Sequence, residues 1–155
     1  MGAVENHRDK AIELVQPQLE KGERIVAAFG DLLVRKDSSD AAASLSATVA
    51  MGAAMGQAVR LLRTKNRPMV FTDRRVFLLQ CNRMQVATEV AVAVPREKAH
   101  VQQVHFGKGP IKLCNRLDVT LDGHPFRLEC GHRSDEQLQA LASSFQCEVT
   151  GNPPS

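Results

Sequence analysis

Residues 111–130, IKLCNRLDVTLDGHPFRLEC, indicate most clearly how this chain folds. Apolar and polar residues alternate along 111–121, which is the pattern of a strand with one buried face. Asp122-Gly123 is a strong signal for a two-residue hairpin turn, and it would place Leu121 opposite His124. That register brings two pairs of opposite charge face to face: Asp118 with Arg127, and Arg116 with Glu129. Because the turn alone sets the register, the charge pairs are an independent indication of the hairpin.

The segment after this hairpin predicts a closing helix at about 134–147. Its apolar residues share one helical stripe: Leu138, Leu141, Ala142 and Phe145. Ser134 and Gln137 have the spacing of a capping box, so we expect Ser134 to accept the N3 amide and Gln137 to reach back. We expect the tail TGNPPS, residues 150–155, to be frayed.

Upstream, the pattern predicts a helix at about 6–16, a strand at roughly 23–34, and strand-like runs at 68–72, 75–81, 86–94 and 100–106. Residues 41–59, AAASLSATVAMGAAMGQAV, are uncharged and mostly small, unlike their surroundings. We therefore expect a single domain, 1–155, with a helical insertion at about 37–66 after the first strand. The expected fold is mainly β: a seven-stranded antiparallel barrel or sandwich closed by the C-terminal helix.

Four motifs, in this order and spacing, resemble the bacterial pleckstrin-homology (PH-like, GRAM-like) domains. They are Leu-x-x-Gly-Glu at 19–23, VFTDRRVFLL at 70–79, VPREKAHVQQV at 94–104 and the closing helix. Together they span about residues 19–147. The chain has no Trp, which many PH domains carry in the closing helix, and Phe145 is the residue we expect in that place. The resemblance implies a PH-like barrel. In family members that bind phosphoinositides, the ligand surface is the loop joining the first two strands and the neighbouring hairpin.

Positive charge is concentrated in one segment. The net charge is +3, but residues 41–85 carry seven basic groups and one acidic group. We name as the basic rim the candidate residues for contact with an anionic ligand or partner: Arg60, Arg63, Lys65, Arg67, Arg74 and Arg75. One interpretation is a solvated face, since exposed charges are common. The other is contact with anionic lipid, in the loop region that the resemblance points to, although the family's basic pattern inside those strands is not matched.

The turn Thr72-Asp73-Arg74-Arg75 falls between two apolar runs. We expect Asp73 to cap this turn with an Asx-type bond. Arg75 is expected to lie along the sheet and Arg74 to point outward with the upstream arginines. The tip of this hairpin would then border the insertion.

The insertion itself has three interpretations. It could lie on its own barrel, touch a membrane, or mediate self-association through a stripe of small and apolar residues: Leu45, Val49, Gly52, Gly56 and Val59. A transmembrane helix is disfavoured because Ala, Ser, Thr, Gly and Gln are only weakly apolar.

No residue pattern predicts catalysis, a metal or a cofactor. The five histidines are scattered without a recognised motif, and the four cysteines (Cys81, Cys114, Cys130 and Cys147) contain no CxxC pair. Cys114 and Cys130 would fall on opposite faces of the predicted hairpin, which argues against a shared disulfide or metal. Nucleic acid is disfavoured as a partner because Trp and Tyr are absent from the chain.

We therefore expect a non-catalytic binding or adaptor module that contacts anionic membrane lipid or an acidic protein through the insertion and the basic rim. The alternative is a self-assembling homo-oligomer with residues 41–63 at the interface. Because the polar N-terminus MGAVENHRDK has no apolar core of a signal peptide, we expect a cytoplasmic protein, peripheral at the inner membrane face if it binds lipid.

Overall fold

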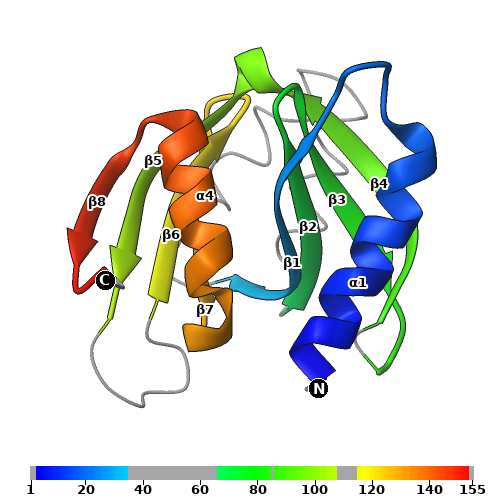
Figure 1. The fold of residues 1–155 in the computed structure, drawn as a ribbon, viewed down its shortest axis with the longest axis horizontal. Helices are drawn as coiled ribbons and strands as arrows, with labels where there is room; N and C mark the ends of the chain where they lie inside the picture. The colour runs from blue at the N-terminus through cyan, green and yellow to red at the C-terminus, as the bar shows by residue number, and fades with distance from the viewer. Residues whose placement is uncertain (1–2, 35–65, 85, 108–114, 154–155) are drawn as a thin grey trace.

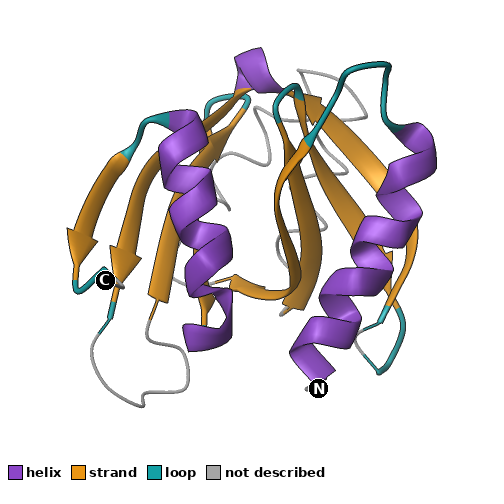
Figure 2. Cartoon of the chain, viewed as in Figure 1, coloured by secondary structure: helices purple, strands orange, loops and turns teal. Residues whose placement is uncertain are grey.

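The computed structural model of the protein describes residues 3–34, 66–84, 86–107 and 115–153 (Figure 1). Strands predominate, with two α-helices in these ranges (Figure 2). In chain order the elements are α1 (Ala3–Val15), η1 (Gln16–Gln18), β1 (Ile25–Val34), β2 (Asn66–Thr72), β3 (Arg75–Cys81), β4 (Ala87–Pro95), η2 (Arg96–Lys98), β5 (Ala99–Phe106), β6 (Asn115–Leu121), β7 (His124–Cys130), η3 (His132–Ser134), α4 (Asp135–Phe145) and β8 (Glu148–Gly151).

The strands form one eight-stranded sheet in the order β4-β3-β2-β1-β7-β6-β5-β8. Neighbouring strands are antiparallel except for β5 and β8, which are parallel, so the sheet is mixed. The mainly β prediction is confirmed, but the described strands do not close into the expected barrel. β1 pairs with β7 only at Leu33 and Val34, so most of β1 diverges from β7 along this side.

The β6–β7 hairpin has the register predicted from its turn. The paired positions run from Asn115 opposite Cys130 to Leu121 opposite His124. Asp122 and Gly123 form the turn with φ of 51° and 84°. Arg127 Nε donates to Asp118 Oδ1 over 3.1 Å, which confirms that charge pair.

Two apolar clusters lie on opposite faces of the β1–β4 half of the sheet. The larger cluster fills the inner face and includes Leu138 and Leu141 of α4, and the smaller cluster packs Ala11 and Val15 of α1 onto the outer face. β2 and β3 contribute side chains to both clusters. Burial on both faces explains why these strands are continuous apolar runs in the sequence rather than alternating ones.

Gly30 lets α1 pack closely on β1. A Cβ at this position would collide with the His7 side chain and with the Arg8 backbone. Only glycine therefore fits where the first half of α1 crosses the strand.

α4 covers the side of β1 that β7 leaves unpaired (Figure 1). Gln137 Oε1 accepts the Ala28 N–H over 2.8 Å, linking the helix to the strand. Ser134 is the N-cap but makes no side-chain capping bond. The predicted capping box is therefore wrong, because Gln137 is used to satisfy a strand amide instead. Phe145 packs edge-to-face on Phe71 with ring centroids 6.1 Å apart, so it joins the core as expected.

The chain beyond α4 is ordered as a strand, which corrects the expectation of a frayed tail. β8 pairs with β5 from Gln103 opposite Glu148 to Phe106 opposite Gly151. The Asn152 N–H then donates to the Phe106 carbonyl over 2.7 Å.

Candidate functional site

Two ends of the sheet could carry a binding surface. The hairpin end holds the start of β1 and the β2–β3 turn, since Ile25 pairs with Thr72. The insertion end holds the end of β1 and the start of β2, since Leu33 pairs with Asn66. The β3–β4 turn is also at the insertion end, because β3 runs antiparallel to β2.

At the hairpin end, Arg75 forms an ion pair with a buried carboxylate. Its guanidinium donates from Nη2 to Glu23 Oε1 over 2.6 Å and from Nε to Glu23 Oε2 over 3.2 Å. Nη2 also donates to the Gln18 carbonyl over 2.8 Å. The Glu23 side chain is completely buried. The Arg75 hydrogen bonds, helped by those from Thr72 and the Glu20 amide, hold the pKa of Glu23 at about 2, against the opposing effect of burial.

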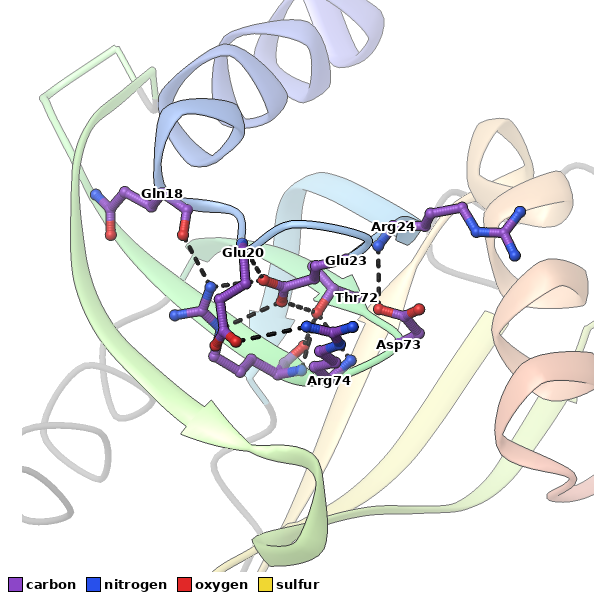
Figure 3. Close-up of polar contacts among 8 residues, drawn as sticks. Gln18, Glu20, Glu23, Arg24, Thr72, Asp73 and Arg74 are labelled. Atoms are coloured by element: carbon purple, nitrogen blue, oxygen red, sulfur yellow. Dashed lines mark hydrogen bonds and ion pairs between the residues drawn. The ribbon is translucent and has the colours of Figure 1, made fainter.

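Thr72 rather than Asp73 holds the β2–β3 turn together (Figure 3). Thr72 Oγ1 accepts the Arg74 N–H over 3.1 Å and the Arg75 N–H over 2.8 Å, and donates to Glu23 Oε2 over 2.5 Å. Asp73 Oδ1 instead accepts the Arg24 N–H over 3.0 Å. The predicted Asx-type cap by Asp73 is therefore wrong: its carboxylate joins this turn to the start of β1.

Arg74 and Arg96, also at the hairpin end, have intramolecular partners. Arg74 Nη1 lies 3.5 Å from Glu20 Oε2 on the surface. Arg96 Nη1 and Nη2 donate to the Asp73 and Ser144 carbonyls over 3.1 and 2.7 Å, and its guanidinium lies 4.1 Å from the centre of the Phe145 ring. Arg74 and Arg75 are thus paired with carboxylates of the same chain, and Arg96 with backbone carbonyls.

Arg67 does not belong to an exposed surface. It is 5% exposed, and its Nη1 donates to the Leu79 carbonyl over 3.1 Å. Burial lowers the pKa of its guanidinium below the usual value, partly offset by the nearby Cys81 thiol. Its place in the predicted basic rim is therefore corrected: it belongs to the interior of the sheet.

The predicted rim is also divided along β2. Arg74 and Arg75 lie at the hairpin end, whereas the insertion rejoins the sheet at Asn66, about 20 Å away for a seven-residue strand. The hairpin tip therefore lies at the opposite end of β2 from Asn66, and the expectation that it borders the insertion falls outside the described residues. Outside the described residues lie Arg60, Arg63 and Lys65, and the predicted interface residues Leu45, Val49, Gly52, Gly56 and Val59.

The β3–β4 turn is a feature of the insertion end that sequence reasoning missed. Arg83 is exposed and Met84 is 75% exposed, the most exposed large apolar side chain among the described residues. Asn82 Oδ1 accepts the N–H groups of Met84 and Val86 over 2.9 and 3.1 Å, which holds the turn in shape. An Asn followed by an Arg-Met pair between two strand-like runs was the available signal.

The described residues show no group of three or more His, Cys, Asp or Glu arranged to hold a metal. Cys81, Cys130 and Cys147 are thiols, and burial raises the pKa of the Cys147 thiol. Neither helix in the described ranges has the length and apolar character needed to cross a membrane.

Comparison with known proteins identifies no matching family model and no significantly similar curated protein.

Proposed function

We propose that this protein is a non-catalytic, PH-like binding module that attaches to an anionic membrane surface through the insertion end of its sheet. The fold is compatible with the PH-like assignment: seven antiparallel strands in chain order are followed by a helix on the inner face. A short eighth strand and the open sheet are departures from the expected barrel.

The observation that carries the proposal is the exposed Arg83-Met84 pair on a turn held by Asn82. A cation next to an exposed apolar side chain suits the boundary between headgroups and acyl chains, where Met is buried and Arg pairs with phosphate. Met is also flexible enough to adapt to a disordered lipid surface.

Charge distribution also favours the insertion end. Arg60, Arg63 and Lys65 come directly before Asn66, where β2 begins at the insertion end, and Arg83 lies on the β3–β4 turn at the same end. Each basic residue near an anionic surface contributes about 1 kcal/mol to binding. At the hairpin end, Arg74 and Arg75 already pair with Glu20 and Glu23, so they offer less attraction to an anionic surface.

Co-sedimentation with vesicles tests the proposal. The protein should bind phosphatidylserine-rich vesicles, bind phosphatidylcholine vesicles poorly, and be released at about 1 M salt, where the Debye length is about 3 Å. Arg83→Glu should lower binding about tenfold or more, since two charges change at the contact surface.

Lys98→Glu is the matched control. It makes the same charge change at an exposed position in η2, at the hairpin end, and should leave binding within about twofold. Equal losses in both variants would indicate attraction to overall charge rather than a defined surface. Absence of vesicle binding at low salt would exclude the proposal and favour an acidic protein partner.

A further inference from the structure

The C-terminal strand β8 is attached to the sheet differently from the other seven strands. It is four residues long, occupies an edge, and is parallel to its neighbour β5. No residue of β8 is buried, and Val149 is 43% exposed. β8 therefore supplies backbone pairing for β5 but adds little to the core.

The side of β8 that faces α4 is loosely packed. A pocket of about 300 Å³ lies between the helix and the C-terminal segment, lined by Phe106, Gln139, Ala142, Ser143, Val149 and Pro153. A short strand with few apolar contacts is the kind of segment that opens locally at low cost in free energy.

The docking site on β5 is nevertheless specific for this segment. Gly151, with φ of 83°, brings its backbone so close to the Phe106 carbonyl that a Cβ would collide with that oxygen. Thr150 Oγ1 lies 3.0 Å from Gln103 Nε2 and 2.9 Å from His105 Nδ1. These contacts select a Thr followed by a Gly in an extended segment.

The hinge before β8 is short and conformationally unfavourable. Only Gln146 and Cys147 separate α4 from β8, and Gln146 has φ of 52° and ψ of 45°. A left-handed conformation costs a residue with a Cβ about 1–2 kcal/mol. An extended hinge would relieve this strain, would break the 3.3 Å hydrogen bond from the Cys147 N–H to the Ala142 carbonyl, and would carry β8 away from its own β5.

We propose that β8 is an exchangeable strand, which docks on β5 of its own chain in a monomer and on β5 of a second copy in a reciprocal dimer. The second copy is the partner that the site fits, because its Thr150-Gly151 segment reproduces each contact that β8 makes within one chain. Since the docked contacts are the same in both forms, hinge strain and protein concentration decide between them.

This proposal is independent of the proposed membrane contact. The dimer would form through the β5 edge, whereas lipid is proposed to contact the β3–β4 turn. Either proposal can therefore fail alone.

Two variants at the hinge test strand exchange. Gln146→Gly accepts the left-handed conformation without strain and should favour the monomer. Gln146→Val makes that conformation more costly and should favour the dimer. We expect dimer association constants that differ by at least about tenfold, measured by light scattering over a concentration series. Circular dichroism of both variants checks that the fold is retained.

A second substitution identifies the surface that forms the dimer. Adding Gly151→Ala to Gln146→Val should restore the monomer, because the strand can then dock neither within a chain nor between chains. A dimer that persists with Gly151→Ala would mean that another surface associates, and would overturn the proposal. A Gln146→Val protein that stays monomeric at all concentrations would also overturn it.

Wild-type protein provides a test that does not depend on the hinge variants. Refolding at high concentration should trap some of the chains as dimers, and the Gly151→Ala protein should give none under the same conditions. Absence of dimer from wild-type protein in this experiment would contradict strand exchange.

Discussion

Glu23 determines the electrostatic character of the hairpin end. Its buried carboxylate receives hydrogen bonds from Arg75, Thr72 and the Glu20 amide. A buried charge is tolerated only when its hydrogen-bonding capacity is satisfied in this way. The arginine that looked available for a ligand in the sequence therefore stabilises the fold.

Glu23 should make stability depend on pH in the acid range. Because its pKa falls from 4.5 to about 2 on folding, the unfolded chain binds more protons between these values. The stabilisation is therefore complete above about pH 4.5 and is lost as pH falls toward 2. The shift corresponds to about 3 kcal/mol. Urea unfolding of wild type and Glu23→Gln should be measured from pH 2 to 7. The difference between their free energies of unfolding should shrink as pH falls from about 4.5 toward 2.

Glu20→Gln is the matched control for this measurement. The Glu20 side chain is 60% exposed and pairs with Arg74 at the surface, so its loss should change the free energy of unfolding by less than about 1 kcal/mol. A pH-independent gap between Glu23→Gln and wild type would mean that the buried ion pair does not form.

At the scale of single elements, local patterns predicted the β6–β7 hairpin correctly and the cap of α4 incorrectly. The hairpin register follows from a turn and alternating residues that are all within 20 positions of one another. Gln137 also had a suitable local partner, but its Oε1 instead accepts the N–H of Ala28, 109 residues away. Tertiary contacts override a local pattern when a strand amide would otherwise lack an acceptor.

Exchanging the two charges of the Asp118–Arg127 pair in the β6–β7 hairpin should restore part of the stability that reversing one charge removes. Asp118→Arg would lose contacts with Arg127 at 3.1 Å and Arg116 at 3.6 Å, and would bring three guanidinium groups together. We expect a loss of about 1–2 kcal/mol in the free energy of unfolding. Adding Arg127→Asp should recover about half, because only the cross-strand pair is restored. Denaturant unfolding of wild type, Asp118→Arg, Arg127→Asp and the double variant measures the coupling. No recovery in the double variant would contradict the pairing.

The path of the strands decides which charged residues share a surface. Arg67 and Arg74 are seven positions apart in the sequence, yet β2 carries the chain from one end of the sheet to the other between them. A cluster that is compact in the sequence is thus dispersed by an extended strand. The strands and their approximate limits could be predicted from the sequence. The Glu23–Arg75 pair could not, because its residues are 52 positions apart and meet only in the assembled sheet.

The C-terminal strand shows the same limit. Thr150-Gly151 looked like the start of a frayed tail because the short segment that contains them has no apolar pattern. Its order comes from the open edge of β5 and from the close approach that Gly151 allows. Such a strand is specified by its docking site rather than by its own composition.

We propose that the insertion end, not the hairpin end, contacts an anionic membrane, and fluorescence can distinguish the two ends. The chain contains no Trp and no Tyr, so one introduced Trp reports a single position by its fluorescence. With phosphatidylserine-rich vesicles, emission from Met84→Trp should shift to shorter wavelength and return at about 1 M salt, where surface attraction is screened. Emission from Arg74→Trp, at the hairpin end, should not change. A shift in Arg74→Trp alone, or no shift in Met84→Trp, would contradict the claim.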